Sequence, residues 1–137
     1  MTQIYTIGTS TRSLDEFLSL LDKHGIKKII DVRRFPTSKF EHFKKENMEK
    51  LRIGYIHIPE LGGYRGDYKE YMETPEFQRG LKELLKLIQK EKCAIFCAEL
   101  LYFRCHRRFI SDALTKKGIK VLHIVDEKRV IPHKLRD

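Results

Sequence analysis

Two short segments hold most of the side chains that could do chemistry in this chain. The first closes an apolar stretch with Cys97 and Glu99, and the second places Cys105, His106 and Arg107 in a row. Cationic neighbours and a helix N-terminus lower the pKa of a cysteine toward the range of activated thiols, while carboxylates and imidazoles transfer protons. The pattern therefore predicts a catalytic site in which either cysteine is the nucleophile and Glu99 and His106 handle protons.

Arginines and small residues elsewhere in the chain complete the predicted site. Arg33 and Arg34 directly follow a stretch of strand character, and the guanidinium fork matches the oxygen atoms of phosphates and carboxylates. We expect one of the two to face the site and the other to pair with an acidic neighbour. The predicted anion-binding residues are Gly8, Ser10, Arg33, Arg34 and Arg107.

Each of these residues also has a purely structural interpretation. Cys93 lies in the same apolar stretch as Cys97 and is expected to be a small core residue. Cys105 could be packed and unreactive, and Glu99 could simply pair with a nearby arginine. Zinc binding by Cys97, Cys105 and His106 is disfavoured, because adjacent ligands seldom reach one ion and no paired ligand motif is present. The sequence predicts no metal and no cofactor.

Alternating strand and helix patterns must position these side chains. Five short apolar stretches have strand character: residues 3–8, 26–32, 54–58, 93–98 and 119–125. Five such strands separated by helices predict an α/β fold, a single-domain three-layer sandwich over residues 1–137 with a mainly parallel sheet of about five strands. We expect right-handed crossovers, and the strand order stays open.

Helix signals separate the strands. Ser13 and Glu16 form a capping box, and Gly25 is placed to end that helix in a left-handed conformation. Thr74 and Pro75 mark the start of a long helix. Two further helices are expected over residues 44–51 and between residues 104 and 118, and the basic tail to residue 137 could add a short edge element.

A parallel sheet has a consequence for the site. All of its strands end at one edge, and this C-terminal edge is where such folds bind ligands. That edge would bring together Gly8, Arg33 and Cys97, which end or follow three different strands. The site thus depends on whether the segments around residues 33 and 105 meet at a shared concave surface.

The composition is that of a folded, basic protein. Of the 137 residues 41% are hydrophobic, and 28 Lys and Arg against 19 Asp and Glu give a net charge of +9. A positive field favours polyanionic and phosphorylated partners. No apolar stretch reaches the ~20 residues that span a bilayer, no signal-peptide pattern opens the chain, and three cysteines cannot all pair. We expect a cytoplasmic protein without a membrane partner and leave the oligomeric state open.

Four motifs resemble those of the DUF488 family of uncharacterised prokaryotic proteins: residues 5–10, 31–36, 97–99 and 105–107. The resemblance covers essentially the whole chain and implies an α/β domain with a common site. The chain departs from the family pattern at Thr9, where members usually carry histidine, and in residues 100–103, which lack a frequent proline. The family name assigns no activity.

Three functional hypotheses follow from these observations. The first is an enzyme that acts on a phosphate-bearing substrate, a nucleotide or nucleic acid, with the predicted cysteine as nucleophile. The second is a non-catalytic module that binds nucleic acid or a nucleotide, whose affinity would fall steeply with salt. The third is a thiol redox or sulfur-transfer role for Cys97 and Cys105.

Overall fold

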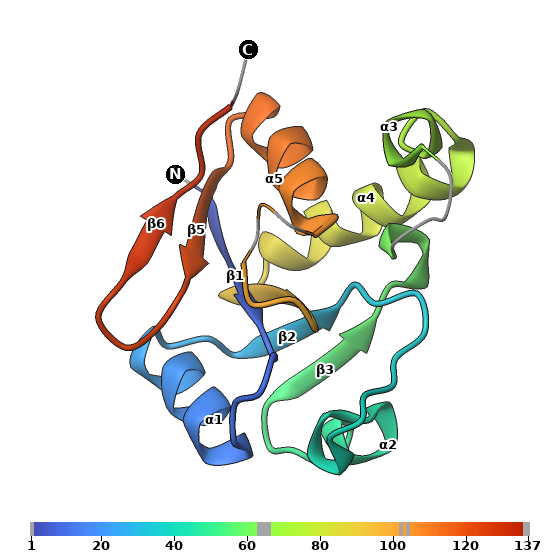
Figure 1. Cartoon of the computed structure of the whole chain (residues 1–137). Helices are drawn as coiled ribbons and strands as arrows, with labels where there is room; N and C mark the ends of the chain where they lie inside the picture. The colour runs from blue at the N-terminus through green and yellow to red at the C-terminus, as the bar shows by residue number, and fades with distance from the viewer. Residues whose placement is uncertain (1, 63–66, 102, 104, 136–137) are drawn as a thin grey trace.

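A mainly parallel sheet forms the centre of the molecule (Figure 1). Its strands are β1 (Gln3–Gly8), β2 (Lys28–Asp31), β3 (Gly54–His57), β4 (Cys93–Cys97), β5 (Lys120–Ile124) and β6 (Val130–Pro132). The computed structural model describes residues 2–62, 67–101, 103 and 105–135, and within them the strand order is β3-β2-β4-β1-β5-β6. Strands β1 to β5 run parallel, and β6 pairs antiparallel with β5. The predicted α/β fold is confirmed, and the edge element of the basic tail is a sixth strand.

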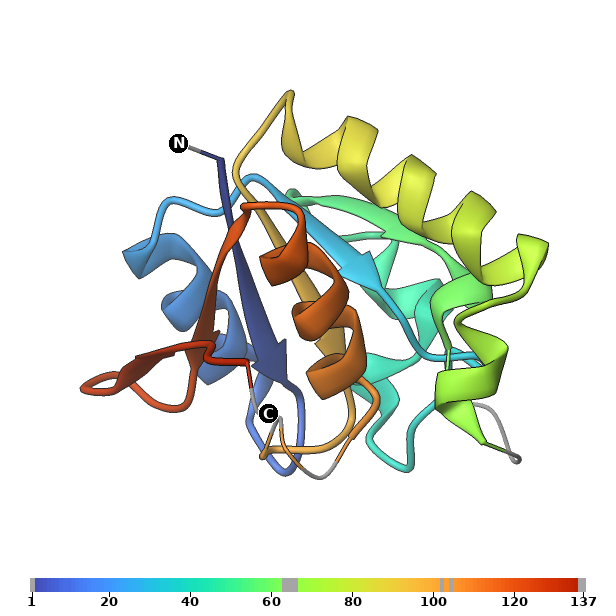
Figure 2. The same ribbon diagram turned by 90° about the horizontal axis from the view of Figure 1, so that it is seen from above.

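Helices cover both faces of this sheet. They are α1 (Leu14–Lys23), α2 (Lys45–Met48), α3 (Tyr68–Tyr71), α4 (Pro75–Ile88) and α5 (Arg107–Lys116), with single 3-10 turns at η1 (Glu41–Phe43) and η2 (Pro59–Leu61). Helices α1 and α2 pack into one hydrophobic core, and α3, α4 and α5 pack into another. Figure 2 shows α1 and α5 on opposite sides of β1. We call the two sides of the sheet the α1 face and the α5 face.

The local sequence signals place the helix ends as expected. The Ser13 side chain accepts a hydrogen bond from the Glu16 backbone N–H and caps α1. Gly25 follows that helix with a φ of 67°, a conformation that glycine adopts without steric cost. Thr74 caps α4 by accepting from the Phe77 N–H. Side-chain caps thus mark the starts of α1 and α4, and a glycine in the left-handed conformation follows the end of α1.

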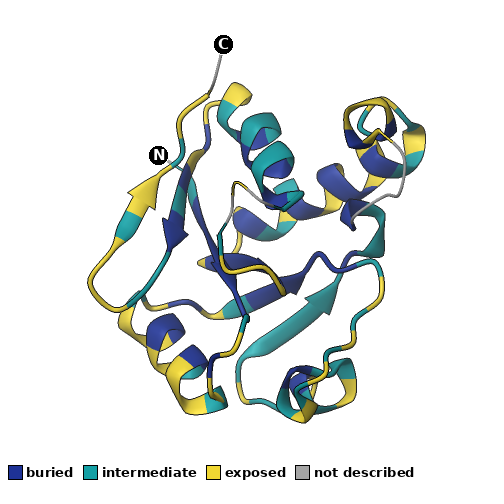
Figure 3. Ribbon diagram, in the orientation of Figure 1, coloured by how far each residue is buried: buried dark blue, intermediate teal, exposed yellow. Residues whose placement is uncertain are grey.

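Side chains alternate between the two faces along the central strands. In β4, Cys93, Ile95 and Cys97 belong to the core of the α5 face, whereas Ala94 and Phe96 belong to the core of the α1 face. Strand β4 is buried along its whole length, in contrast to the intermediate burial of β3, which is teal in Figure 3. The sulfur atom of Cys97 is therefore directed to the α5 face by the strand itself.

Three neighbouring strands end at the same edge of the sheet. Gly8 pairs with Cys97 at the ends of β1 and β4, and Asp31 pairs with Phe96 at the end of β2. The segments that follow, residues 32–36 and 98–101, therefore leave the sheet side by side. Among the described residues, every helix is too short or too polar to cross a lipid bilayer.

Candidate functional site

Cys97 and Cys105 face each other at the loop that joins β4 to α5. Cys97 is the last residue of β4, and its Sγ lies 2.8 Å from the Sγ of Cys105, two residues before α5. Both are free thiols. Cys97 is only 3% exposed, whereas Cys105 is partly exposed. The pair therefore joins a buried thiol to an accessible one.

The Cys105 sulfur is surrounded by hydrogen-bond donors. The backbone N–H of Arg107, at the start of α5, donates to it at 3.2 Å, and Nδ1 of His106 lies 3.8 Å away. His106 Nε2 lies 2.7 Å from the carbonyl oxygen of Val32, which can only accept, so Nε2 carries a proton. The other ring nitrogen, Nδ1, faces the Cys105 sulfur, and His106 lowers the pKa of that thiol. His106 can thus balance a negative charge on Cys105.

The two thiols share their protons unequally. The Cys97 thiol donates to Cys105, which lowers the pKa of Cys105 well below its ordinary value. His106 and Arg107 lower it further, while burial opposes them. The same hydrogen bond, with burial, raises the pKa of Cys97. The structure therefore favours a thiolate on the accessible Cys105 and a protonated thiol on the buried Cys97.

Arg107 is a buried cation with no carboxylate partner in the described part of the chain. The residue is 1% exposed, and its guanidinium donates to Thr6 Oγ1 and to the carbonyl oxygens of Glu99 and Leu100. Its Nε is buried and has no hydrogen-bond partner among the residues that the structure describes. A buried charge is costly unless an opposite charge lies nearby. The Cys105 thiolate is the negative charge that Arg107 stabilises.

The Arg33 guanidinium lies on the α1 face, across the sheet from the two sulfur atoms. It forms a bidentate ion pair with Asp31, at 2.8 Å from Nε to Oδ1 and 2.7 Å from Nη2 to Oδ2. It also donates to the Phe43 carbonyl oxygen and lies over the Phe96 ring, both of which belong to the α1-face core. Arg33 is 6% exposed. Arg33, one of the three arginines that were predicted to bind an anion, is therefore already paired with an internal carboxylate.

Arg34 is the arginine beside the thiols. Its side chain is 28% exposed, lies over the ring of Tyr71 and sits 3.7 Å from a carboxylate oxygen of Glu76 on α4. It also lines an open cavity of about 330 Å³, together with the residues of both segments: Arg33, Phe35, Cys97, Ala98, Glu99, Cys105 and His106. The two segments that the sequence required to meet do share a concave surface.

The remaining predicted site residues have structural contacts. The backbone of Gly8 lies directly against that of Glu99, and the Ser10 N–H donates to the Ala98 carbonyl oxygen. Glu99 is exposed at the cavity, where its carboxylate accepts from the Leu101 N–H. Neither Gly8 nor Ser10 is among the residues that line the cavity. They shape the loop that carries Glu99, and their role as anion ligands stays a prediction.

Replacing Gly8 by alanine is expected to destabilise the fold by about 3 kcal/mol. The new Cβ would lie 2.0 Å from the Glu99 carbonyl oxygen, which is backbone and already accepts from Arg107. Urea denaturation measures the loss. The matched control is Gly54→Ala, whose Cβ would meet the flexible Lys28 side chain at 3.2 Å and the Lys27 carbonyl oxygen at 3.5 Å, an ordinary contact distance. Equal stabilities of the two variants would contradict the close packing of this loop on β1.

A buried chain of polar side chains, which no sequence pattern indicated, continues from Arg107. Thr6 accepts from Arg107 and donates to Nδ1 of His123 at 2.6 Å. His123 Nε2 then donates to His133 Nδ1 at 2.8 Å, and His133 Nε2 donates to Asp112 at 2.6 Å. Burial, then His133 and Arg107, lower the pKa of His123 to about 3, so its ring is neutral. These residues are far apart in sequence, and only the fold brings them together.

Two polar side chains of β3, Tyr55 and His57, contact the end of β2 and were not among the predicted site residues. Tyr55 donates to the Asp31 carboxylate at 2.5 Å, and His57 Nε2 donates to the Arg33 carbonyl oxygen at 2.6 Å. Both come from β3 and hold the end of β2. Arg104, which directly precedes Cys105 in the sequence, lies outside the described residues. Among the described residues, no group of three or more His, Cys, Asp or Glu side chains is placed to hold a metal ion.

Comparison with known proteins gives one match. Residues 13–114 match the family model of the domain of unknown function DUF488. No curated protein and no solved structure matches the chain. The match includes β2, β3, β4 and most of α5, and therefore both segments that form the cavity.

Proposed function

This chain belongs to the DUF488 family, and from its site we propose that it performs thiol–disulfide exchange, with Cys105 as the attacking thiolate and Cys97 as the resolving thiol. One observation carries the proposal. The two sulfur atoms lie 2.8 Å apart, and the hydrogen bond from Cys97, with His106 and Arg107, lowers the pKa of the accessible Cys105. Exchange requires a thiolate within reach of the substrate and a second thiol within reach of the first.

The reaction balances with the groups at the site. The Cys105 thiolate attacks one sulfur of a substrate disulfide, the new S–S bond forms, and the old one breaks with its electron pair on the departing sulfur. Cys97 Sγ then attacks Cys105 Sγ, and the second departing sulfur takes the Cys97 proton. The substrate gains two electrons, and the pair loses two as an intramolecular disulfide. His106 and Arg107 stabilise the starting thiolate.

The cavity favours a disulfide over a phosphate group as the reacting partner. Two of the arginines predicted to hold an anion, Arg33 and Arg107, already donate to internal acceptors. The first N–H of α5, on Arg107, donates to the Cys105 sulfur, and that of Arg108 donates to the Cys105 carbonyl oxygen. Phosphate binding needs several unoccupied donors around one point. The geometry therefore supports the phosphate hypothesis less well than the thiol hypothesis.

A redox titration tests the proposal. The protein is equilibrated with mixtures of reduced and oxidised glutathione, its free thiols are alkylated, and its peptides are analysed by mass spectrometry. We expect one intramolecular disulfide between Cys97 and Cys105. Cys93 is the internal control, because it is fully buried and its pKa is raised to about 11 by burial. Separate glutathione adducts on Cys97 and Cys105, with no bond between them, would contradict the proposal.

A further inference from the structure

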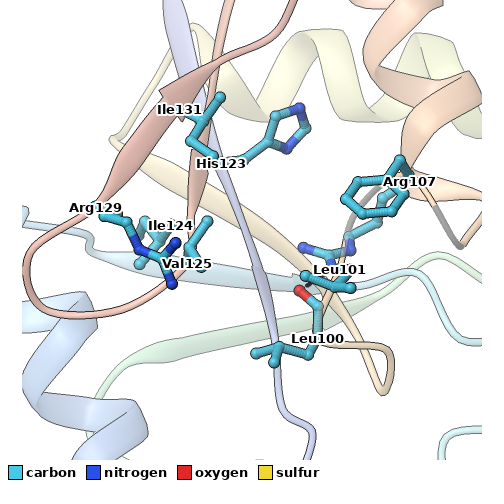
Figure 4. Close-up of a pocket in the computed structure, with 9 residues that line it drawn as sticks. Leu100, Leu101, Arg107, His123, Ile124, Val125, Arg129 and Ile131 are labelled. Carbon is cyan, nitrogen blue, oxygen red and sulfur yellow. Dashed lines mark hydrogen bonds between the residues drawn. The ribbon is translucent and has the colours of Figure 1, made fainter.

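A second cavity, of about 180 Å³, lies between the β4–α5 loop and the edge strands β5 and β6 (Figure 4). Its walls are mainly apolar side chains: Leu100, Leu101 and Phe103 from the loop, and Ile124, Val125 and Ile131 from the strand side. Phe103 and Ile131 are 41% and 39% exposed, so this apolar surface continues to the outside of the molecule. None of these residues lines the first cavity, which contains Cys97 and Cys105 and which we call the thiol cavity.

The polar groups of this second cavity differ in what they can still bind. Both ring nitrogens of His123 are hydrogen-bonded, to Thr6 and to His133. Arg129 pairs with Asp126 at the surface. Arg107 differs from both, because a guanidinium has five N–H donors and only three hydrogen bonds hold it in the described structure. Figure 4 shows its guanidinium reaching from α5 to Leu100 and Leu101 at the cavity wall.

We propose that this second cavity binds a small carboxylate with a short apolar chain, whose carboxylate pairs with Arg107. The apolar walls exclude water and favour a hydrocarbon chain. Among the described residues, the buried guanidinium pairs with no carboxylate, and its Nε has no hydrogen-bond partner. A carboxylate is the planar acceptor that fits a guanidinium fork. The proposal rests on this cavity and on Arg107, which also stabilises the Cys105 thiolate.

The cavity size limits the ligand. Binding sites for drug-sized molecules measure about 300–1,000 Å³, so 180 Å³ accommodates a chain of only a few carbon atoms. Hexanoate, with eight non-hydrogen atoms, is a suitable probe. From the binding efficiency of small ligands we expect a dissociation constant of about 0.1–1 mM.

Nuclear magnetic resonance titration of the reduced full chain tests the proposal. Hexanoate is expected to shift the ¹H–¹⁵N signal of the Arg107 Nε–H group, which a ligand bound elsewhere would leave unchanged. Hexanol keeps the chain without the charge, and acetate keeps the charge without the chain. Both are expected to bind at least about tenfold more weakly than hexanoate, in line with one lost ionic or apolar contact. Equal affinities for hexanoate and either control would overturn the proposal.

A pair of surface variants tests the location without disturbing the buried arginine. Ile131→Trp fills the mouth of the second cavity and is expected to weaken hexanoate binding at least about tenfold. Leu135→Trp is the matched control, because Leu135 is 43% exposed and is not among the cavity residues. Unchanged binding by Ile131→Trp, or equal loss in both variants, would overturn the assignment.

Discussion

Replacing Cys105 by serine is expected to lower the rate of disulfide reduction by about 10³-fold or more, because a hydroxyl is not ionised near neutral pH and cannot replace the attacking thiolate. The substitution changes one atom at a position that is partly exposed, so the fold is expected to persist. The rate is measured with a chromogenic aromatic disulfide under single-turnover conditions. A Cys105→Ser variant that retains more than a tenth of the rate would exclude this cysteine as the nucleophile.

Cys97→Ser distinguishes the two roles. The serine hydroxyl can still donate a hydrogen bond to the Cys105 sulfur, so the first attack is expected to remain within about tenfold of the original rate. The mixed disulfide on Cys105 is then expected to accumulate, because no second thiol lies 2.8 Å away to resolve it. Cys93→Ser is the control and is expected to change neither step, since Cys93 lies at the other end of β4.

Asp31→Ala is expected to destabilise the fold by about 3–5 kcal/mol, because removal of one partner leaves a buried and uncompensated charge. Asp31 is fully buried and holds both the Arg33 guanidinium and the Tyr55 hydroxyl. Urea denaturation followed by circular dichroism measures the change in the free energy of unfolding. This pair anchors the end of β2, and hence residues 33–35, which form one wall of the thiol cavity.

Two controls separate this effect from the loss of any ion pair. Glu41→Ala removes the surface pair with Lys44, whose glutamate side chain is 74% exposed, and is expected to cost less than about 1 kcal/mol. The double variant Asp31→Ala, Arg33→Met removes both charges and is expected to recover part of the stability. If Asp31→Ala costs no more than Glu41→Ala, the buried pair does not anchor β2.

The meeting of the two segments could be predicted because it follows from parallel topology. Apolar stretches identified β2 and β4, and the ends of parallel strands lie at one edge. The side on which each arginine lies could also have been inferred. Asp31 and Arg33 are two positions apart, as Val32 and Arg34 are, and side chains alternate across a strand. Arg33 therefore continues the face of Asp31, where the structure places its ion pair.

Other parts of the site have no local signal. The contact between His123 and Thr6 joins residues 117 positions apart, and the Arg107 guanidinium reaches the same threonine from α5. Such contacts depend on which strands become neighbours, and the sequence left the strand order open. The close approach of Gly8 to Glu99 has the same origin, because β1 and β4 are adjacent only in the folded sheet.

The most direct test of the central claim is the pH dependence of Cys105 alkylation by iodoacetamide, followed at the level of the peptide between pH 5 and pH 9. Because Cys97, His106 and Arg107 lower the pKa of Cys105, we expect a rate constant that is nearly independent of pH between about 6 and 8. We also expect Cys97→Ala, which removes the hydrogen bond between the thiols, to move the midpoint to higher pH. A rate constant that instead rises about tenfold per pH unit toward a midpoint near 8.5, as for an ordinary thiol, would contradict a stabilised thiolate at this site.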